Sequence, residues 1–448
     1  MTAGRRTLSR NIGSPSVSWS PFIRRIDANR TVKDAIEAGI RSRGGRSRIS
    51  VTDLVNPMQA YYGRTQPEIQ IPLDRLQLMW TGTGFHRLFG AAVSTEEFLE
   101  QFVERDGVVG KIDIFEDFPI ELKTSASLPE DLLAQRPAYV DQLAMYCYMA
   151  ERPAGAVVVY RREEFGRDPA LMAYRVAFHD LEKIGARMRE RRDLFLDALA
   201  RNDPSRLERC EWFGRRCDYE SVCSCASAPP LRRIVDAEDA LVSEDQAMAD
   251  ELKAAARSWR QRPTWAITLN DLVFPRRGVL FRTVGRTDDD DDNLADLQHG
   301  GFFSALTEAI RYSEPGAYKG TSISFETVRG VVRTHRAVPT VIRSTNTREM
   351  IERDRLPFER GDWIDRLALE SALVGSDVGR LVVYYPRLGA GDKFMVYDLG
   401  LSGREHTLAE ARRRLALFEA RAGPSEFPPC GPAWMSRYCP YKDACACQ

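Results

Sequence analysis

The sequence predicts an α/β protein made of two homologous domains. Three observations lead to this prediction: short segments recur at a nearly constant offset, each copy contains both strand-length and helix-length patterns, and each copy ends in four cysteines. The composition agrees, because 448 residues with 43% hydrophobic and 29% charged content are typical of a soluble globular protein of two or three domains.

The duplication is visible without gaps. The segment ISVTDLVNP at Ile49–Pro57 recurs in the second half of the chain as ITLNDLVFP at Ile267–Pro275. The interval between matched residues grows slowly along the chain, as loop insertions in the second copy would make it do. Further matched pairs are, in chain order, Gly110 with Gly330, Pro119 with Pro339, and Tyr160 with Tyr384, each tyrosine being the end of a strand pattern.

Four segments are therefore expected. Residues 1–30 form a basic N-terminal arm, 31–226 the first domain, 227–243 a linker and 244–448 the second domain. The first 50 residues hold eleven Arg or Lys against three Asp or Glu, so the arm is either a phosphate contact or a solvated tail.

A candidate metal site lies in the first copy. Val108–Phe115 reads as a strand with Asp113, and a second strand follows at Phe118–Thr124 with Glu121 and Lys123. Side chains two apart on a strand share a face, and a hairpin can bring Asp113 beside them. Two carboxylates can hold Mg²⁺ or Mn²⁺, which activates a water for attack on a phosphodiester, while the lysine orients that water or offsets developing charge.

Two further segments add candidates to this site. His86 follows Gly82 at a glycine-led helix start and could add a nitrogen ligand that favours manganese. Gln142 and Tyr146 lie one helical turn apart on one face and could meet the metal site or a phosphate backbone. Taken singly, each of these residues has an ordinary structural explanation; the ordered set is the signal.

The cysteines form two groups with similar spacing. Clustered cysteines in an intracellular protein indicate metal rather than disulfides. Four thiolates can hold either a 4Fe-4S cluster or a structural zinc, and the spacing alone does not decide between them. The groups are Cys210, Cys217, Cys223 and Cys225, then Cys430, Cys439, Cys445 and Cys447.

As a set, these marks resemble the RecB-like branch of the PD-(D/E)XK nuclease superfamily, especially the CRISPR-associated exonucleases with a four-cysteine iron-sulfur cluster. The resemblance covers about Ile49–Cys225. It implies two restriction-endonuclease-like domains with a central mixed sheet flanked by helices, metal-dependent DNA cleavage, and 4Fe-4S clusters in preference to zinc. One departure is Asn56, where this family usually places a cysteine.

The second copy lacks the candidate metal ligands. The matches that align the two copies place other residues at every candidate position, which predicts a retained fold without cleavage. The gained arginines either bind phosphate or form intramolecular ion pairs. The replacements are Ser304 for His86, Arg333 for Asp113, Val341 for Glu121, Arg343 for Lys123, Arg366 for Gln142 and Glu370 for Tyr146.

The predicted function is a magnesium- or manganese-dependent DNA exonuclease with a non-cleaving second domain. The alternatives are a non-cleaving nucleic-acid-binding scaffold and a metal-cluster sensor with a vestigial nuclease fold. No Gly-x4-Gly-Lys-Ser/Thr phosphate loop occurs, so DNA unwinding would need a helicase or another CRISPR-adaptation or repair partner. The apolar runs are too short to span a bilayer and the N-terminus has no apolar signal region, so we expect a cytoplasmic protein without membrane contact.

Overall fold

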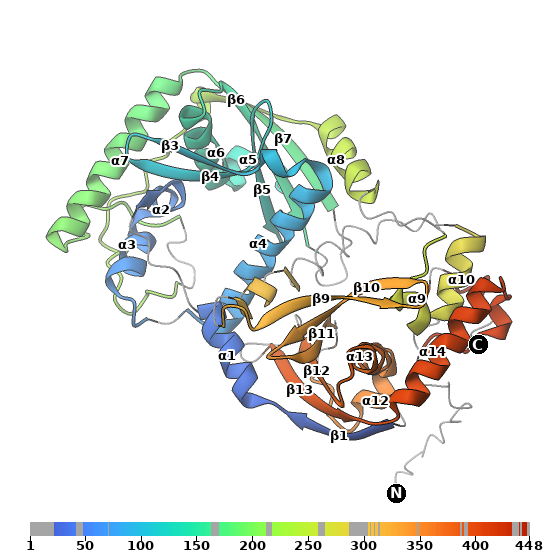
Figure 1. Cartoon of the computed structure of the whole chain (residues 1–448). Helices are drawn as coiled ribbons and strands as arrows, with labels where there is room; N and C mark the ends of the chain where they lie inside the picture. Colours follow the sequence, from blue (N-terminus) through green and yellow to red (C-terminus); the bar gives the residue numbers. More distant parts are fainter. Residues whose placement is uncertain are drawn as a thin grey trace, which may run out of the picture. The chain divides into compact units, whose positions relative to one another are not determined.

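The structure is a computed structural model in which the residues form two compact units (Figure 1). The N-terminal unit comprises residues 36–261 and 290–313, and the C-terminal unit comprises residues 1–35, 262–289 and 314–448. The described residues are 22–41, 48–69, 71–162, 170–211, 217–258, 265–285, 303–345 without 305, 309, 312 and 313, 347, 349–385, 388, 393–431, 439 and 441–445.

The N-terminal unit is built on a mixed seven-stranded sheet of order β2-β4-β5-β6-β7-β8, with β3 paired to β4. Pairing is parallel between β5 and β6 and antiparallel between β4 and β5 and between β6 and β7. The strands are β2 Ile49–Ser50, β3 Leu99–Arg105, β4 Val108–Phe115, β5 Pro119–Ser125, β6 Ala154–Arg161, β7 Ala170–Phe178 and β8 Ala240–Glu244.

Helices cover both faces of this sheet, which gives three layers (Figure 1). The centre of β6 is buried on both sides, as its unbroken apolar run requires: Val157 and Val159 enter one core, Val158 and Tyr160 the other. The first core lies under α2 Val51–Val55, α3 Pro57–Thr65, α6 Pro137–Met149 and α7 Leu181–Arg201. The second lies under α4 Leu73–Val93 and α8 Gln246–Ser258.

The C-terminal unit has a six-stranded sheet of order β1-β13-β12-β11-β10-β9, again mixed because only β11 and β12 run parallel. Its strands are β1 Ile23–Ala28, β9 Tyr318–Phe325, β10 Val328–His335, β11 Val338–Ser344, β12 Val378–Tyr384 and β13 Phe394–Leu401. Its helices include α9 Leu269–Val273, α10 Pro275–Thr283, α12 Leu356–Glu359, α13 Gly361–Val374 and α14 Arg404–Glu419; α1, Arg30–Arg41, follows β1.

The same local contacts occur in both units. Asp53 closes a capping box on Ser50 at the start of α2 and accepts from Arg64 at 2.7 Å. In the C-terminal unit, Asp271 closes the equivalent box at the start of α9 and accepts from Arg282 at 3.1 Å. A buried arginine in α7 and one in α14 each donate to the last turn of the capped helix. The two copies therefore repeat a detailed scaffold as well as an element order.

The register of the paired strands agrees with the residue-by-residue alignment of the two copies. Glu121 lies opposite Val157 in the β5–β6 pair, and Val341 lies opposite Leu381 in the β11–β12 pair. The sequence comparison pairs these same positions, because it aligns β5 with β11 and β6 with β12. Val341 thus stands in the sheet where Glu121 stands in the first copy.

The expected segment boundaries differ from the observed ones in three places. The described residues between 303 and 311 were expected in the second domain but group with the N-terminal unit. Residues 22–28 were assigned to an N-terminal arm, but β1 pairs antiparallel with β13 of the C-terminal unit. Residues 240–243 were assigned to the linker and 244–261 to the second domain, but β8 pairs antiparallel with β7 of the N-terminal unit, and α8 packs on that unit. Each copy is therefore preceded by a strand that completes the sheet of the other copy.

None of the described helices combines the length and the apolar character needed to cross a membrane.

Candidate active site

The site is assembled at the point where β4 and β5 separate. The two strands pair at Ile114–Ile120, and beyond that pair the backbone N–H of Leu122 donates to the Asp113 carboxylate at 2.8 Å. A side chain thus satisfies the N–H group at a point where the described β4–β5 ladder has ended. This contact holds Asp113 against β5, on which Glu121 and Lys123 lie.

Lys123 is held by two acceptors. Its Nζ lies 2.5 Å from Glu121 Oε1 and 2.8 Å from Gln142 Oε1 on α6. Gln142 in turn donates from Nε2 to the Tyr146 hydroxyl at 3.3 Å, one turn along the helix. The ammonium also lies 5.3 Å from the centre of the Tyr139 ring. One lysine therefore connects β5 to the catalytic candidates of α6.

His86 reaches the same site from α4. Its Nδ1 lies 3.6 Å from Asp113 Oδ2. The side chains of His86 and Asp113 are 23% and 22% exposed, whereas that of Glu121 is only 4% exposed, so solvent reaches the cluster on the His86–Asp113 side. All six residues proposed for this site are brought together: His86, Asp113, Glu121, Lys123, Gln142 and Tyr146.

Two buried polar atoms at this site have no hydrogen-bond partner among the described residues: Glu121 Oε2 and His86 Nε2. A buried acceptor or donor without a partner costs about 1–3 kcal/mol. Such atoms in a cluster of carboxylates and imidazole are a chemical fit for a cation. Even so, no three carboxylate, imidazole or thiol groups of the described residues already stand in a metal-binding arrangement.

The two carboxylates have opposite pKa shifts. Burial raises the pKa of Glu121 to about 7, and the nearby Asp113 charge adds to this, although Lys123 opposes it. Burial acts in the same direction on Asp113, but His86, Lys123 and the Leu122 N–H outweigh it and lower the pKa. Burial would lower the pKa of Lys123, but Glu121 more than compensates and raises it. Their surroundings thus favour the charged forms of Lys123 and Asp113, whereas burial favours the protonated form of Glu121.

Three contributors to the site were not singled out from the sequence. Tyr139 lies under the lysine, Leu122 supplies a backbone donor, and Asp141, the buried residue before Gln142 on α6, accepts from the backbone of Ile234 and Val235. Gly110 was noticed only as a repeated position. A Cβ there would lie 2.6 Å from Cε1 of Tyr146, so glycine is what allows this ring to pack on β4.

The first cysteine group is partly drawn together. Burial raises the pKa of the Cys210 thiol and the neighbouring Cys225 adds to this effect; Cys223 and Cys225 also interact with each other. Backbone N–H groups donate to two sulfurs, that of Cys225 to Cys223 Sγ at 3.4 Å and that of Gln59 to Cys210. Asn56, which stands where the nuclease family that the sequence resembles usually has a cysteine, accepts from the N–H of Glu211 at 3.1 Å.

The second cysteine group lies less completely within the described residues. The N–H of Arg277 donates to Cys430 Sγ at 3.3 Å, the counterpart of the Gln59 contact. Cys439 and Cys445 pack with Tyr441 and Leu280 in a small apolar cluster. Cys447 lies outside the described residues.

The C-terminal unit has different chemistry at the equivalent place. Arg366 and Glu370, which replace Gln142 and Tyr146, form an ion pair of 2.5 Å. Arg343 is half-buried, and desolvation together with the nearby Arg366 charge lowers its pKa. Arg333, by contrast, is exposed on β10. Of the three arginines considered for phosphate contact, Arg366 is engaged in an ion pair within its own unit, and Arg333 faces solvent.

No protein-family model and no curated protein matches this chain. Among solved structures, one described as "Crystal structure of SSO0001" matches with 16% identity over 45% of this chain and 96% of that chain, at a TM-score of 0.31. Similarity at that TM-score supports no conclusion about the fold or the function.

Proposed function

We propose that the N-terminal unit is a metal-dependent deoxyribonuclease of the PD-(D/E)XK type, acting as an exonuclease. The observation that supports this most strongly is the convergence of Asp113, Glu121 and His86 on a site where two buried atoms lack partners beside a held lysine. The C-terminal unit, without those ligands, is proposed as a related module that binds or stabilises but does not cut.

The donor set suits Mg²⁺ or Mn²⁺. Asp113 and Glu121 would hold the ion through carboxylate oxygens, and His86 Nε2 would add a nitrogen that favours manganese. Such an ion, when bound, lowers the pKa of a water and offsets charge on the phosphate.

The protein's own groups would orient the reaction. The Lys123 ammonium, held between Glu121 and Gln142, points a donor at the attacking water or at the charge that develops on the phosphate. Gln142, itself bonded to Tyr146, keeps that ammonium from rotating away. In the C-terminal unit the exposed Arg333 is the proposed phosphate contact.

The deciding experiment is cleavage of end-labelled linear DNA by anaerobically purified protein with magnesium or manganese. Glu121→Gln keeps the side-chain shape but removes the charge that would hold the ion, so cleavage should fall at least about a hundredfold. Lys123→Ala should also lose cleavage. Its matched control is Arg343→Ala, at the equivalent position of the C-terminal unit, which should leave cleavage unchanged. Loss in Lys123→Ala but not in Arg343→Ala would place the chemistry in the N-terminal unit.

Two results would contradict the proposal. Equal cleavage by wild type and Glu121→Gln would remove the site assignment. No cleavage by wild type, with DNA still bound, would favour a non-cleaving scaffold.

The cysteine groups are proposed to hold 4Fe-4S clusters, with structural zinc as the alternative. Each group has four cysteines, and backbone N–H groups donate to the sulfurs of Cys223 and Cys430. These features suit either metal, because zinc and iron-sulfur clusters are both bound by cysteine thiolates. Iron, sulfide and zinc analysis of anaerobically purified protein distinguishes the two.

A further inference from the structure

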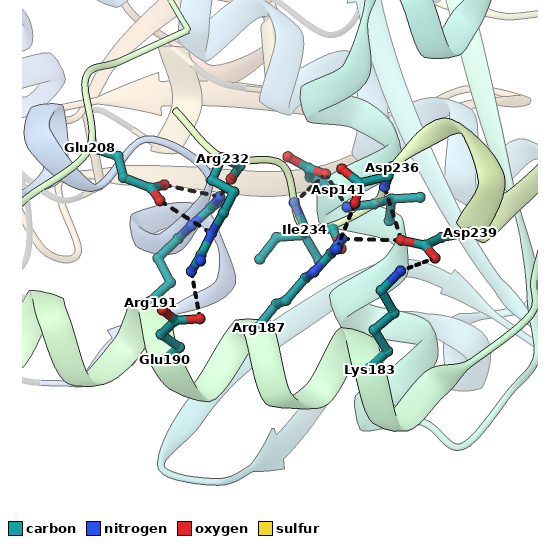
Figure 2. Close-up of polar contacts among 11 residues, drawn as sticks. Asp141, Lys183, Arg187, Glu190, Arg191, Glu208, Arg232, Ile234, Asp236 and Asp239 are labelled. Carbon is teal, nitrogen blue, oxygen red and sulfur yellow. Dashed lines mark hydrogen bonds and ion pairs between the residues drawn. The ribbon is translucent and has the colours of Figure 1, made fainter. Parts of the chain in front are cut away.

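The segment between the two copies is bound tightly to the helices of the N-terminal unit. Residues 232–239, which we call the strap, run along α7 (Figure 2). Lys183, Arg187 and Arg191 of α7 are four residues apart and share one helix face. They contact the strap in order: Lys183 pairs with Asp239 at 2.5 Å, Arg187 with Asp236 at 2.6 Å, and Arg191 donates to the carbonyl of Arg232.

The strap also contacts α6, and it does so through one carboxylate. Oδ1 of Asp141 accepts from the backbone N–H groups of Ile234 and Val235, both at 3.0 Å. Consecutive backbone N–H groups that converge on one oxygen form a small anion-binding nest. Arg187 of α7 holds the same residue of the strap, because it donates to the carbonyl of Ile234 at 2.9 Å.

Asp141 is deeply buried, and only half of its carboxylate is satisfied. It is 1% exposed, Oδ1 has two donors, and Oδ2 has no hydrogen-bond partner among the described residues, with Arg233 3.7 Å away. Holding a carboxylate in this way is costly unless its geometry is fixed. Replacing it by a small apolar residue would leave two buried N–H groups of the strap without an acceptor.

Asp141 immediately precedes Gln142 on α6. Successive residues on an α-helix are about 100° apart around its axis, so the two side chains leave the helix in different directions. Asp141 binds the strap, while Gln142 accepts from Lys123 at 2.8 Å. A rotation of α6 that broke the Asp141 contacts would therefore also move the acceptor that holds Lys123.

We infer that Asp141 is a positioning residue: through the strap it fixes the rotation of α6 and so the place of Gln142 and Lys123 in the proposed active site. This inference rests on the proposed nuclease function. Asp141 makes its hydrogen bonds and ion pair with the strap, so its effect on the chemistry would pass through Gln142.

The test compares Asp141→Ala and Asp141→Asn in the full chain. Asp141→Ala removes both acceptor contacts, so kcat for DNA cleavage should fall about ten- to a hundredfold while KM stays within about twofold, since misplacement of a catalytic group by about 1 Å has effects of this size. Asp141→Asn retains the Oδ1 acceptor and should recover most of kcat. Asp365→Asn, at the equivalent buried position of α13, is the matched control and should leave both parameters unchanged.

A second variant covers the case in which Asp141→Ala does not fold. Arg187→Ala loosens the strap without altering α6 and should lower kcat in the same direction, by a smaller factor. A readout independent of cleavage is hydrogen exchange at the amides of α6, which should be faster in Asp141→Ala and near wild type in Asp141→Asn.

Unchanged kcat in folded Asp141→Ala, with wild type active, would overturn the inference. So would a loss of kcat that Asp141→Asn does not recover, because that would assign the effect to charge and not to position. If wild type does not cleave DNA, the proposed function fails, but faster exchange of α6 in Asp141→Ala still establishes the anchoring.

Discussion

At the scale of single residues, two buried carboxylates in and beside the proposed site have different surroundings and therefore different roles. Glu121 and Asp141 are both buried carboxylates with one oxygen that has no hydrogen-bond partner among the described residues, yet they face different groups. Glu121 accepts from Lys123 and lies within electrostatic range of His86, whereas Asp141 accepts from the N–H groups of the strap. A carboxylate oxygen that shares a cluster with Asp113 and an imidazole suits a cation, while the carboxylate that binds the strap suits the fixing of a helix.

The pKa of Asp141 leads to a prediction about stability. Burial raises this pKa from 3.8 to about 6, with Arg191, Arg233 and the two strap N–H groups opposing the shift only in part. A carboxyl group with a raised folded-state pKa favours folding below its unfolded value and loses that contribution as pH rises through the folded value. Relative to Asp141→Asn, wild type should therefore lose about 3 kcal/mol of unfolding free energy as pH rises from 3.8 to about 6.

Chemical denaturation of both proteins across this range measures the difference. The control is Asp203→Asn, because contacts with Ser205 lower the pKa of that exposed carboxyl. Its contribution is lost only as pH falls below 3.8, so the wild-type-minus-Asp203→Asn difference should stay nearly constant across this range. A wild-type-minus-Asp141→Asn difference that stays constant with pH would mean that Asp141 titrates near its ordinary value.

At the level of elements, the leading strands make matched contacts. The N–H of Asn29, just after β1, donates to Val396 at 2.8 Å, and that of Asp245, just after β8, donates to Ala173 at 2.9 Å. Antiparallel strands alternate in the direction of their N–H groups, so the N–H two residues earlier also faces the neighbouring strand. These residues are Asp27 and Ser243, whose side chains are exposed.

Proline at either position should loosen one sheet and not the other. Asp27→Pro removes a β1–β13 hydrogen bond and should speed hydrogen exchange in β13, while β7 stays protected. Ser243→Pro removes the equivalent β8–β7 bond and should do the reverse. Each variant is thus the control for the other, and exchange that rises equally in β7 and β13 for both variants would contradict the strand assignment.

On the scale of the whole molecule, each copy depends on a β-strand that lies in the sequence next to the other copy. Each copy is preceded by the strand that completes the other copy's sheet: β1 precedes the first copy but pairs in the C-terminal sheet, and β8 precedes the second copy but pairs in the N-terminal sheet. The C-terminal sheet is therefore drawn from two separate stretches of the chain. An unpaired sheet edge exposes backbone N–H and C=O groups and promotes association.

A split chain tests this arrangement. The fragments 1–230 and 231–448 should associate when co-expressed, because the first carries β1 and the second carries the strap, β8 and α8. Each fragment alone should be aggregated or less stable than the pair, as judged by size-exclusion chromatography and thermal unfolding. Two well-folded, monomeric fragments that do not bind each other would contradict the assignment of β1 and β8 to the sheets of the opposite copies.

Much of this architecture follows from the sequence alone. The repeated ISVTDLVNP segment identified the duplication, since a recurring local pattern survives in the sequence whatever the chain does at long range. The spacing of Glu121 and Lys123 predicted a shared face, and the interval between Gln142 and Tyr146 predicted a shared helix face. Such statements need only the period of a strand or a helix.

Tertiary structure alone decided which partners these residues have. The sequence placed β1 in a basic arm and β8 in a linker, because an exposed edge strand has little hydrophobic pattern and its place depends on which sheet edge is free. It likewise gave no reason to connect Asp141 with Ile234, which lies far along the chain. Long-range contacts depend on the packed surfaces that the whole fold creates, and no local spacing encodes them.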